Sequence, residues 1–256
     1  MNTKNQLEEM SLIDHLTELR RRLLWSFIYI IIIFCVCFYF ASDLFYFLAK
    51  PLVNLLNVDE GQGFIYTALQ EAFFTELKIA FFFALFFAFP LIAIQIWKFI
   101  APGLYDNEKS AIMPYLIVTP ILFLLGGMLV YYLIMPLAFK FFLSFESSGM
   151  STGLPIQLEA KVNEYLSLVM KLIFAFGLSF QLPVVLSLLA RINVIDSAFL
   201  KQRRKYVVVI IFAAAAVLTP PDPVTQIGLA IPLLILYELS IFSVKIIEKK
   251  IEKENA

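Results

Sequence analysis

The sequence predicts an all-α integral membrane protein with six transmembrane helices. Hydrophobic residues make up 61% of the chain and its mean hydropathy is +0.85, well above the roughly 45–50% apolar content of soluble domains. These residues form long unbroken runs instead of the alternating apolar and polar positions of a transmembrane β-barrel. Because a lipid-exposed backbone must satisfy its own hydrogen bonds, each run is expected to be a helix.

Six apolar stretches define the expected spans, within one membrane domain that covers residues 1–256. In chain order they are Leu23–Ala41, Ile79–Trp97, Ala111–Pro136, Tyr165–Ala190, Tyr206–Leu218 and Ile227–Val244. Residues 10–22 form an amphipathic segment before the first span, and residues 246–256 form a polar tail after the last. Both flanking segments are expected in the cytoplasm.

The orientation follows from the basic residues. Of the 20 Lys and Arg residues, 15 lie in the two termini and in the second and fourth loops. The other side and its helix ends hold the remaining five, which are Lys50, Lys78, Lys140, Lys161 and Lys171. Since cytoplasmic loops carry an excess of Lys and Arg, both termini are expected to be cytoplasmic.

The spans are expected to differ in length. The fifth stretch has 13 uninterrupted apolar residues, about 20 Å of helix against a hydrocarbon core of roughly 30 Å. The sixth follows after the turn Thr219–Gln226 and shares this constraint, so both are predicted to be short. The third contains several prolines and glycines, which predict a tilted, bent helix.

The two long outer loops, residues 42–76 and 137–164, contain the apolar clusters "DLFYFLAKPLVNLL" and "FKFFLSF". Clusters of this kind are typical of short amphipathic helices that lie along a membrane surface. We expect them to form a cap that braces the outer ends of the spans.

Four charged or amide side chains lie within the spans, where they are costly and therefore candidates for function. Gln95 and Lys171 lie near span ends, where snorkelling or bonding a neighbour is the simpler interpretation. Gln181 lies near the middle of the fourth span, two residues before Pro183. It is equally compatible with bonding carbonyls freed by the proline and with facing a polar groove. Glu238 lies about a turn and a half from the cytoplasmic end of the sixth span, near Lys245, as an interfacial acid would.

Several functional classes receive no support. The sequence has no phosphate-binding glycine loop, no "HExxH" and no nucleophile elbow, so an enzyme is not expected. His15, Cys35 and Cys37 do not make a metal site, and no metal or other cofactor is expected. A net charge of zero gives no reason to expect nucleic acid as a partner. A small-molecule transporter and a receptor for another polypeptide both remain.

The stretch "HLTELRRRLL", residues 15–24, belongs to an amphipathic helix. One stripe of the helix is apolar, and Glu18 lies towards the opposite face. An i, i+4 pair with Arg22 is the simplest interpretation of Glu18, although exposed pairs of this kind stabilise little. The stripe consists of Leu12, Leu16, Leu19 and Leu23.

Four segments together resemble one known family. They are "HLTELRRRLL", "QIWKFIAPGLYDNEK", "FGLSFQLPVVL" and "LTPPDPVTQIGLAIPLLILYELSIF". Their order and spacing are similar to those of TatC, the large multi-spanning subunit of the twin-arginine protein translocase, over about residues 10–245. The six spans and cytoplasmic termini predicted above agree with that family.

The resemblance implies a receptor for signal peptides that carry two consecutive arginines on folded precursor proteins. It also implies assembly with TatA-like and TatB-like single-span subunits, a homo-oligomer within the complex, and export driven by the proton-motive force. The expected location is the bacterial plasma (inner) membrane, in contact with lipid. The alternative is a secondary transporter that binds a small polar solute through Gln181, Lys171 and Glu238.

The resemblance also assigns residues. Glu18 and Arg20 match the N-terminal recognition motif, and Phe99 and Glu108 match the first cytoplasmic loop. Structural or partner-coupling positions are Pro51, Gln181, Asp222, Gln226 and Glu238.

Two acids could each hold a guanidinium through parallel hydrogen bonds, which a lysine ammonium cannot reproduce. Position 181 is commonly a glutamate in the family, so Gln181 implies that polarity or hydrogen bonding suffices there.

Overall fold

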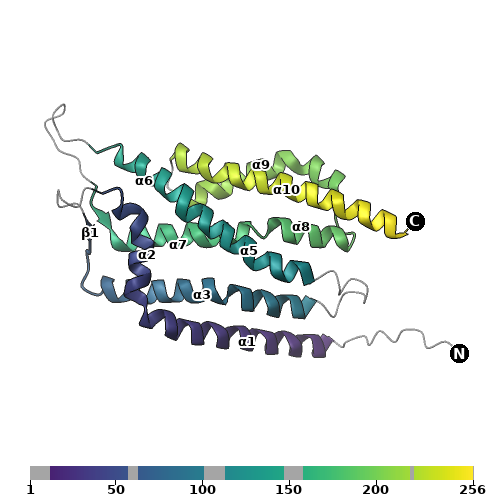
Figure 1. The fold of residues 1–256 in the computed structure, drawn as a ribbon, viewed down its shortest axis with the longest axis horizontal. Coiled ribbons are helices and arrows are strands. Elements are labelled where there is room, and N and C mark those ends of the chain that lie inside the picture. The colour runs from purple at the N-terminus through teal and green to yellow at the C-terminus, as the bar shows by residue number, and fades with distance from the viewer. Residues whose placement is uncertain (1–11, 57–62, 101–112, 147–157, 220–221, 256) are drawn as a thin grey trace.

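The protein is a bundle of long helices that run side by side, with one short helix lying across them (Figure 1). The computed structural model describes residues 12–56, 63–100, 113–146, 158–219 and 222–255. The start of α1 and the end of α10 lie at the same end of the bundle, here called the terminal end. The opposite end carries α2, β1 and α6.

Helices cover all six apolar stretches predicted from the sequence, and the short helix α2 lies outside them. Their bounds are α1 Leu12–Tyr39, α2 Ala41–Val53, α3 Glu71–Ile100, α5 Met113–Leu129, the π-helical turn η3 Val130–Ile134, α6 Met135–Leu143, α7 Val162–Ser179, α8 Leu182–Arg191, α9 Ser197–Leu218 and α10 Pro223–Asn255. The third span comprises α5, η3 and α6, and the fourth comprises α7 and α8. The all-α membrane fold with six spans is confirmed.

Five helical segments of the described chain are long and apolar enough to cross a membrane. The helix α9 is not among them, because residues 201–205 in its first half are Lys-Gln-Arg-Arg-Lys. Its apolar part is as short as the sequence predicts.

The sixth span differs from the prediction, since α10 is a continuous helix of 33 residues. Only its apolar stretch is short, and the predicted polar tail continues the same helix.

The outer cap forms in part as predicted. The helix α2 crosses the opposite end of the bundle (Figure 1) and buries Leu48, Ala49, Pro51 and Leu52. The "FKFFLSF" cluster differs from the prediction, because its helical part continues the third span as α6. Pro136 cannot donate a main-chain N–H within this continuous span, and the wider turn η3 directly precedes it.

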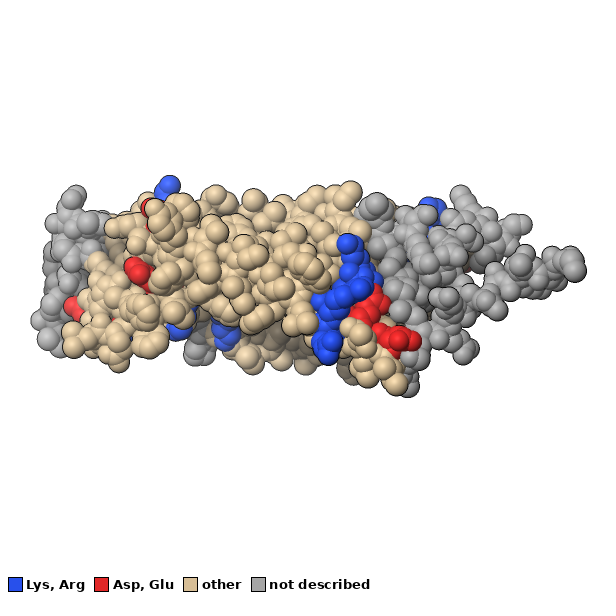
Figure 2. Space-filling model, turned by 90° about the horizontal axis from the view of Figure 1, so that it is seen from below, with Lys and Arg blue, Asp and Glu red and all other residues tan. Residues whose placement is uncertain are grey.

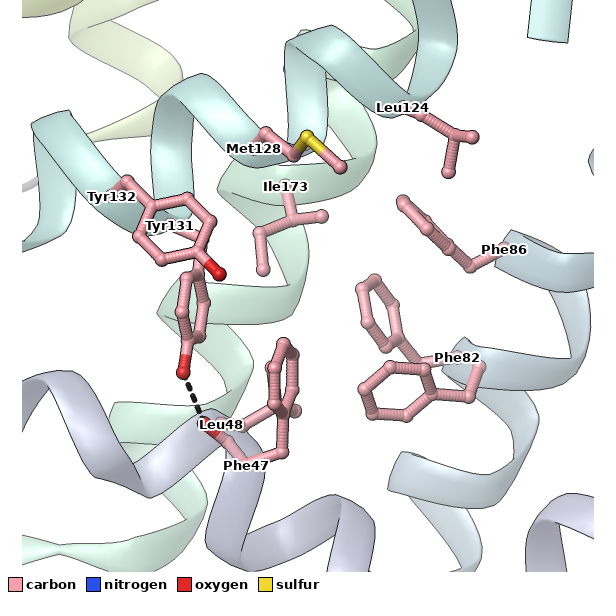
Figure 3. Close-up of a pocket in the computed structure, with 11 residues that line it drawn as sticks. Phe47, Leu48, Phe82, Phe86, Leu124, Met128, Tyr131, Tyr132 and Ile173 are labelled. Atoms are coloured by element: carbon pink, nitrogen blue, oxygen red, sulfur yellow. Dashed lines mark hydrogen bonds between the residues drawn. The ribbon is translucent and has the colours of Figure 1, made fainter. Parts of the chain in front are cut away.

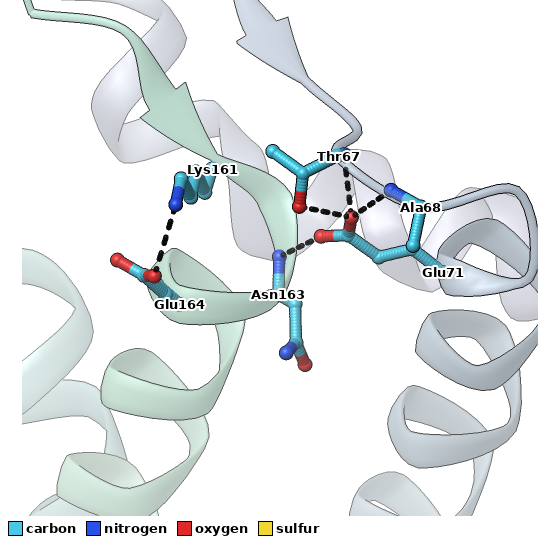
Figure 4. A network of polar contacts seen from close by, with 6 residues as sticks. All are labelled: Thr67, Ala68, Glu71, Lys161, Asn163 and Glu164. Atoms are coloured by element: carbon cyan, nitrogen blue, oxygen red, sulfur yellow. Dashed lines mark hydrogen bonds and ion pairs between the residues drawn. The ribbon is translucent and has the colours of Figure 1, made fainter.

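A two-residue parallel pairing, which the sequence does not predict, joins the outer loops. Strand β1 (Phe64–Ile65) pairs with β2 (Ala160–Lys161), so that Phe64 lies opposite Ala160. Beside it, Glu71 accepts hydrogen bonds from the backbone N–H groups of Thr67 (2.7 Å), Ala68 (3.2 Å) and Asn163 (3.3 Å). Figure 4 shows how this carboxylate links the start of α3 to the start of α7.

Small residues let α5 and α7 cross closely. A Cβ atom added to Gly126 would lie 2.6 Å from the carbonyl oxygen of Phe176, and one added to Gly177 would lie 2.6 Å from the ring of Phe123. Phe123 and Phe176 are both fully buried, and Phe176 belongs to the main core. Close approach at glycine is a common way for membrane helices to gain van der Waals contact.

Pro51 leaves one main-chain carbonyl of α2 without its helical partner. A proline at position 51 cannot donate to the carbonyl of Phe47, four residues earlier. Instead, the hydroxyl of Tyr131 in η3 donates to Phe47 O at 2.7 Å, and the two rings stack with centroids 4.6 Å apart. Tyr165 of α7 donates to the next carbonyl, Leu48 O, at 2.8 Å. Two tyrosines therefore fasten α2 across the bundle.

We predict that Tyr131→Phe destabilises the protein by about 1–3 kcal/mol, because it leaves the Phe47 carbonyl unsatisfied. Thermal unfolding in detergent micelles measures the effect, and Tyr132→Phe is the matched control on an exposed neighbour. In a Pro51→Ala background the backbone N–H of residue 51 can reach Phe47 O, so Tyr131→Phe should cost less. Equal costs in both backgrounds would contradict this account.

Candidate functional site

A polar cluster joins α1 to α3 at the terminal end. The Arg22 side chain donates to Glu18 Oε1 through Nη2 (2.9 Å) and Nε (3.3 Å). Its Nη1 donates to Gln95 Oε1 of α3 at 3.3 Å. Figure 2 shows basic and acidic side chains gathered at this end, beside a broad surface without charges. The predicted i, i+4 pair is therefore present, with a second anchor on the neighbouring helix.

This pair is more enclosed than the sequence suggests. The side chain of Glu18 is 11% exposed and that of Arg22 is 21% exposed. The attraction within an enclosed pair is less screened by water, but desolvation of both charges offsets it, and losing one partner leaves a costly uncompensated charge. Gln95 is buried, so the expectation that it bonds a neighbour is confirmed.

Phe99 lies in the same region. Its ring stacks on His15 of α1, with centroids 4.3 Å apart and planes 22° apart. His15 and Glu18 are three residues apart and so share one face of α1. No functional role for His15 was expected from the sequence; its i, i+3 spacing from Glu18 is the signal that points to it.

The other two predicted recognition residues are placed differently. Arg20 is exposed, and its position two residues from Glu18 directs it to another side of the helix. Glu108 lies outside the described residues. The structure thus brings Glu18 and Phe99 to one region of α1 and α3, separates Arg20 from Glu18, and does not describe Glu108.

Gln181 lies at a break in the fourth span, between α7 and α8, and not within a continuous helix. Its amide Nε2 donates to Thr119 O of α5 at 3.0 Å and to Gly177 O at 3.4 Å. Its Oε1 and the hydroxyl of Thr119 are buried and bind no described residue. The site therefore uses a neutral donor to join two spans and retains unused polar capacity.

Asp222 and Gln226 organise the turn between α9 and α10. Asp222 is buried and precedes Pro223, and its carboxylate accepts from the backbone N–H of Thr225 at 2.7 Å and from the Thr225 hydroxyl. It is therefore the N-cap of α10. Gln226 donates through Nε2 to Phe212 O of α9 at 3.2 Å, which ties the two helices together.

The remaining intramembrane candidates do not share partners. Glu238 forms an ion pair with Arg204 of α9 at 2.6 Å, so its partner is on another helix and is not Lys245. Lys171 donates to Val217 O at 2.9 Å, near the end of α9. Gln181 binds α5. Because the three side chains bind separate partners, they do not form the single solute site that the transporter alternative requires.

Glu248 is a structural residue that sequence reasoning missed. It lies in the predicted polar tail, and its carboxylate accepts from the backbone N–H of Ser197 (2.5 Å) and from the Ser197 hydroxyl (2.6 Å). Together with Asp196, which accepts from Phe199 N, it satisfies N–H groups at the start of α9. An Asp followed by Ser is a sequence signal for that start, because both side chains can cap a helix.

The described residues at the terminal end can bind a cation through Glu18. No group of three His, Cys, Asp or Glu side chains that could hold a metal occurs among them. The enclosed carboxylate of Glu18 already holds one guanidinium, which donates to Oε1 alone. Comparison with known proteins decides which class of membrane protein this is.

Residues 14–232 match the family model described as Sec-independent protein translocase protein (TatC). The chain belongs to the TatC family. It is 50% identical over 249 residues to TatC of Magnetococcus marinus, covering 97% of this chain and 89% of that protein. It is 38% identical over 231 residues to TatC of Escherichia coli, covering 90% of this chain and 86% of the relative.

Solved structures agree with this family assignment. A crystal structure described as the twin arginine translocase receptor TatC superposes with a TM-score of 0.78 at 39% identity, covering 91% of this chain and 99% of the other. The resemblance expected from four sequence segments is confirmed. This TatC-family chain is a multi-pass membrane subunit of a protein translocase.

We predict that Asp222→Ala lowers the stability of this chain by about 1 kcal/mol, because α10 loses its N-cap. Asp222→Asn should retain most of the stability, since an amide oxygen can also accept from Thr225 N. Thermal unfolding in micelles compares the two variants. An equal loss in both would mean that the charge, and not the cap, is what the turn needs.

Proposed function

We propose that this chain is the receptor of its translocase for signal peptides with two consecutive arginines. Glu18 and Glu108 are the acids that bind the arginines, and Phe99 contacts the apolar part of the same peptide. The terminal end is cytoplasmic, in the plasma membrane of a bacterium. The chain acts without catalytic chemistry, as one membrane domain.

The geometry of Glu18 is the observation that supports this proposal best. Both contacts with Arg22 reach Oε1, and no described residue donates to Oε2. An incoming guanidinium can therefore approach Oε2 or displace Arg22. Displacement need not leave Arg22 without a partner, because its Nη1 is also bound to Gln95.

The enclosure of Glu18 favours arginine over lysine. A carboxylate pairs with a planar guanidinium through two parallel hydrogen bonds, whereas an ammonium offers a point charge. The low exposure of Glu18 strengthens such bonds relative to bulk water, although desolvation offsets part of the gain. Two acids that each hold one arginine would select an Arg-Arg pair.

Partners follow from the same proposal. The chain assembles with TatA-like and TatB-like single-span subunits and with further copies of itself, and the proton-motive force drives export of the folded precursor. Gln181 is the residue assigned to partner coupling within the membrane. Its Oε1 and the neighbouring Thr119 hydroxyl are buried and unpaired, so a partner helix reaches them only when the packing around the break between α7 and α8 opens. Arg20 adds an exposed cation at the cytoplasmic surface.

We predict that Glu18→Ala and Glu108→Ala each weaken binding of an Arg-Arg signal peptide about 10-fold or more, because each removes charge-assisted hydrogen bonds. The double variant should fall to the level of a Lys-Lys peptide. Binding to the purified complex and export of a folded precursor measure the effects.

Glu238→Ala is the matched control, since it also breaks a Glu–Arg pair but on α10 and α9. It should leave signal-peptide binding unchanged. A photo-reactive residue beside the precursor's arginines should cross-link near Glu18. Wild-type binding and export by the Glu18 and Glu108 variants would show the site assignment to be wrong.

We predict that Gln181→Leu impairs export while Gln181→Glu is tolerated. Leucine removes the donor to Thr119 O, whereas a protonated carboxyl retains one hydrogen to donate. The stability cost should be modest, about 0.6–1.7 kcal/mol. Val185→Leu, one turn further on, is the control, and normal export by the leucine variant would remove the argument.

A further inference from the structure

Two pockets adjoin at the opposite end of the bundle, between α2, α3 and the third span. The apolar pocket is shown in Figure 3 and has a volume of about 150 Å³. The basic pocket beside it has a volume of about 340 Å³. Phe47, Tyr131 and Tyr132 line both, so the two pockets form one continuous surface feature.

The basic pocket carries two positive charges. Lys50 of α2 and Lys140 of α6 line it together with Asn54, and no carboxylate is among the described residues of its lining. Both lysines are exposed. They are two of the five basic residues that the sequence places away from the cytoplasmic side, so they are not explained by topology. This pocket is complementary to an anion.

The apolar pocket is lined by aromatic and aliphatic side chains. Figure 3 shows Phe82 and Phe86 of α3 on one side and Tyr131 and Tyr132 of η3 on the other, with Phe47 below. Its lining includes the exposed side chains Leu124 and Met128, so it opens towards the lipid-facing surface of α5. Gly127 contributes space, because a Cβ there would lie 3.1 Å from the Phe86 ring.

The walls of this feature are fixed by interactions already described. The hydroxyl of Tyr131 is bonded to Phe47 O and the two rings are stacked. Tyr132 packs edge-on against Tyr131 and is 70% exposed at the junction of the two pockets. An amphipathic tyrosine at such a junction is typical of the membrane–water interface.

We propose that these two pockets together bind one anionic phospholipid in the outer leaflet. The phosphodiester of the headgroup lies between Lys50 and Lys140, and an acyl chain lies in the apolar pocket against Phe82, Phe86 and Met128. The lipid then fills the space between α2 and the third span, where α2 is fastened by Tyr131. The site is separate from the signal-peptide site at the terminal end and does not depend on it.

The charge pattern distinguishes this feature from the other polar pocket at the same end. That pocket also contains two lysines, Lys78 and Lys161, but its lining includes Glu71 and Glu164. Lys78 is bonded to Asn163 Oδ1, and Lys161 pairs with Glu164 at 3.7 Å (Figure 4 shows the latter). Its charges are balanced within the protein, whereas those of the basic pocket are balanced by an anionic ligand.

The test is lipid binding to the full-length protein in detergent micelles, counted by native mass spectrometry. Phosphatidylglycerol is compared with phosphatidylcholine of the same acyl chains, and with glycerol 3-phosphate, which has no acyl chain. We expect one phosphatidylglycerol to bind at least 10-fold more tightly than phosphatidylcholine, and no binding of glycerol 3-phosphate at the same concentration. Equal binding of the two lipids, or binding of glycerol 3-phosphate as tight as that of the lipid, would overturn the proposal.

Variants locate the site. Lys50→Gln and Lys140→Gln should each weaken phosphatidylglycerol binding about fivefold, and Lys50→Arg should retain it. Lys161→Gln, an exposed lysine at the same end, is the matched control. Met128→Trp should weaken binding by filling the apolar pocket. If neither glutamine variant changes binding, or if Lys161→Gln weakens it equally, the site is not the one proposed.

A single-span protein helix is the competing occupant of the apolar pocket. If Met128→Trp abolished co-purification of a single-span partner subunit while leaving phosphatidylglycerol binding unchanged, the pocket would belong to that partner and the proposal would be wrong. Reduced lipid binding with normal co-purification supports the lipid.

Discussion

The main physical constraint on this protein is that a main-chain carbonyl within or near the hydrocarbon layer must find a hydrogen-bond partner. Prolines, helix ends and breaks repeatedly remove the helical donor. Side chains, most of them from other helices, donate to these carbonyls instead. The hydroxyl of Tyr131 donates to Phe47 O, which has no helical donor because residue 51 is proline. The Gln181 amide donates to Gly177 O at the break before Pro183. The Lys171 ammonium donates to Val217 O at the end of α9. Each of these irregularities is thus paired with a tertiary contact.

These contacts explain why polar residues within the spans need not mark a transport path. Lys171 and Gln181 bind backbone oxygens, and Gln226 does the same between α9 and α10. Their cost in lipid is offset by the carbonyls that they satisfy. Gln181 differs because it also leaves Oε1 buried and unpaired beside the equally unpaired Thr119 hydroxyl. That remaining polarity is where a role in coupling to a partner has a physical basis.

The same framework gives the two ends of the bundle different chemistry. At the terminal end, α1 and α3 hold an enclosed carboxylate beside the stacked rings of His15 and Phe99, which suits an arginine followed by apolar residues. At the opposite end, α2 and the third span leave two lysines above an apolar pocket, which suits a lipid. The ligands proposed for the two ends are therefore of opposite charge, a cation at the terminal end and an anion at the opposite end, and each has an apolar part.

The sequence by itself determined the fold class, the six spans, the family and the Glu18–Arg22 pair. Hydrophobic runs, basic loops and i, i+4 spacing are local properties of the chain, and the four family segments are long enough to be specific. The tertiary structure decided the partners of the polar residues: Gln95 for Arg22, Thr119 for Gln181, Arg204 for Glu238 and Ser197 for Glu248. It also extended α10 through the polar tail. These pairings join residues far apart in the chain, and only the packing of one helix on another sets the distance between them.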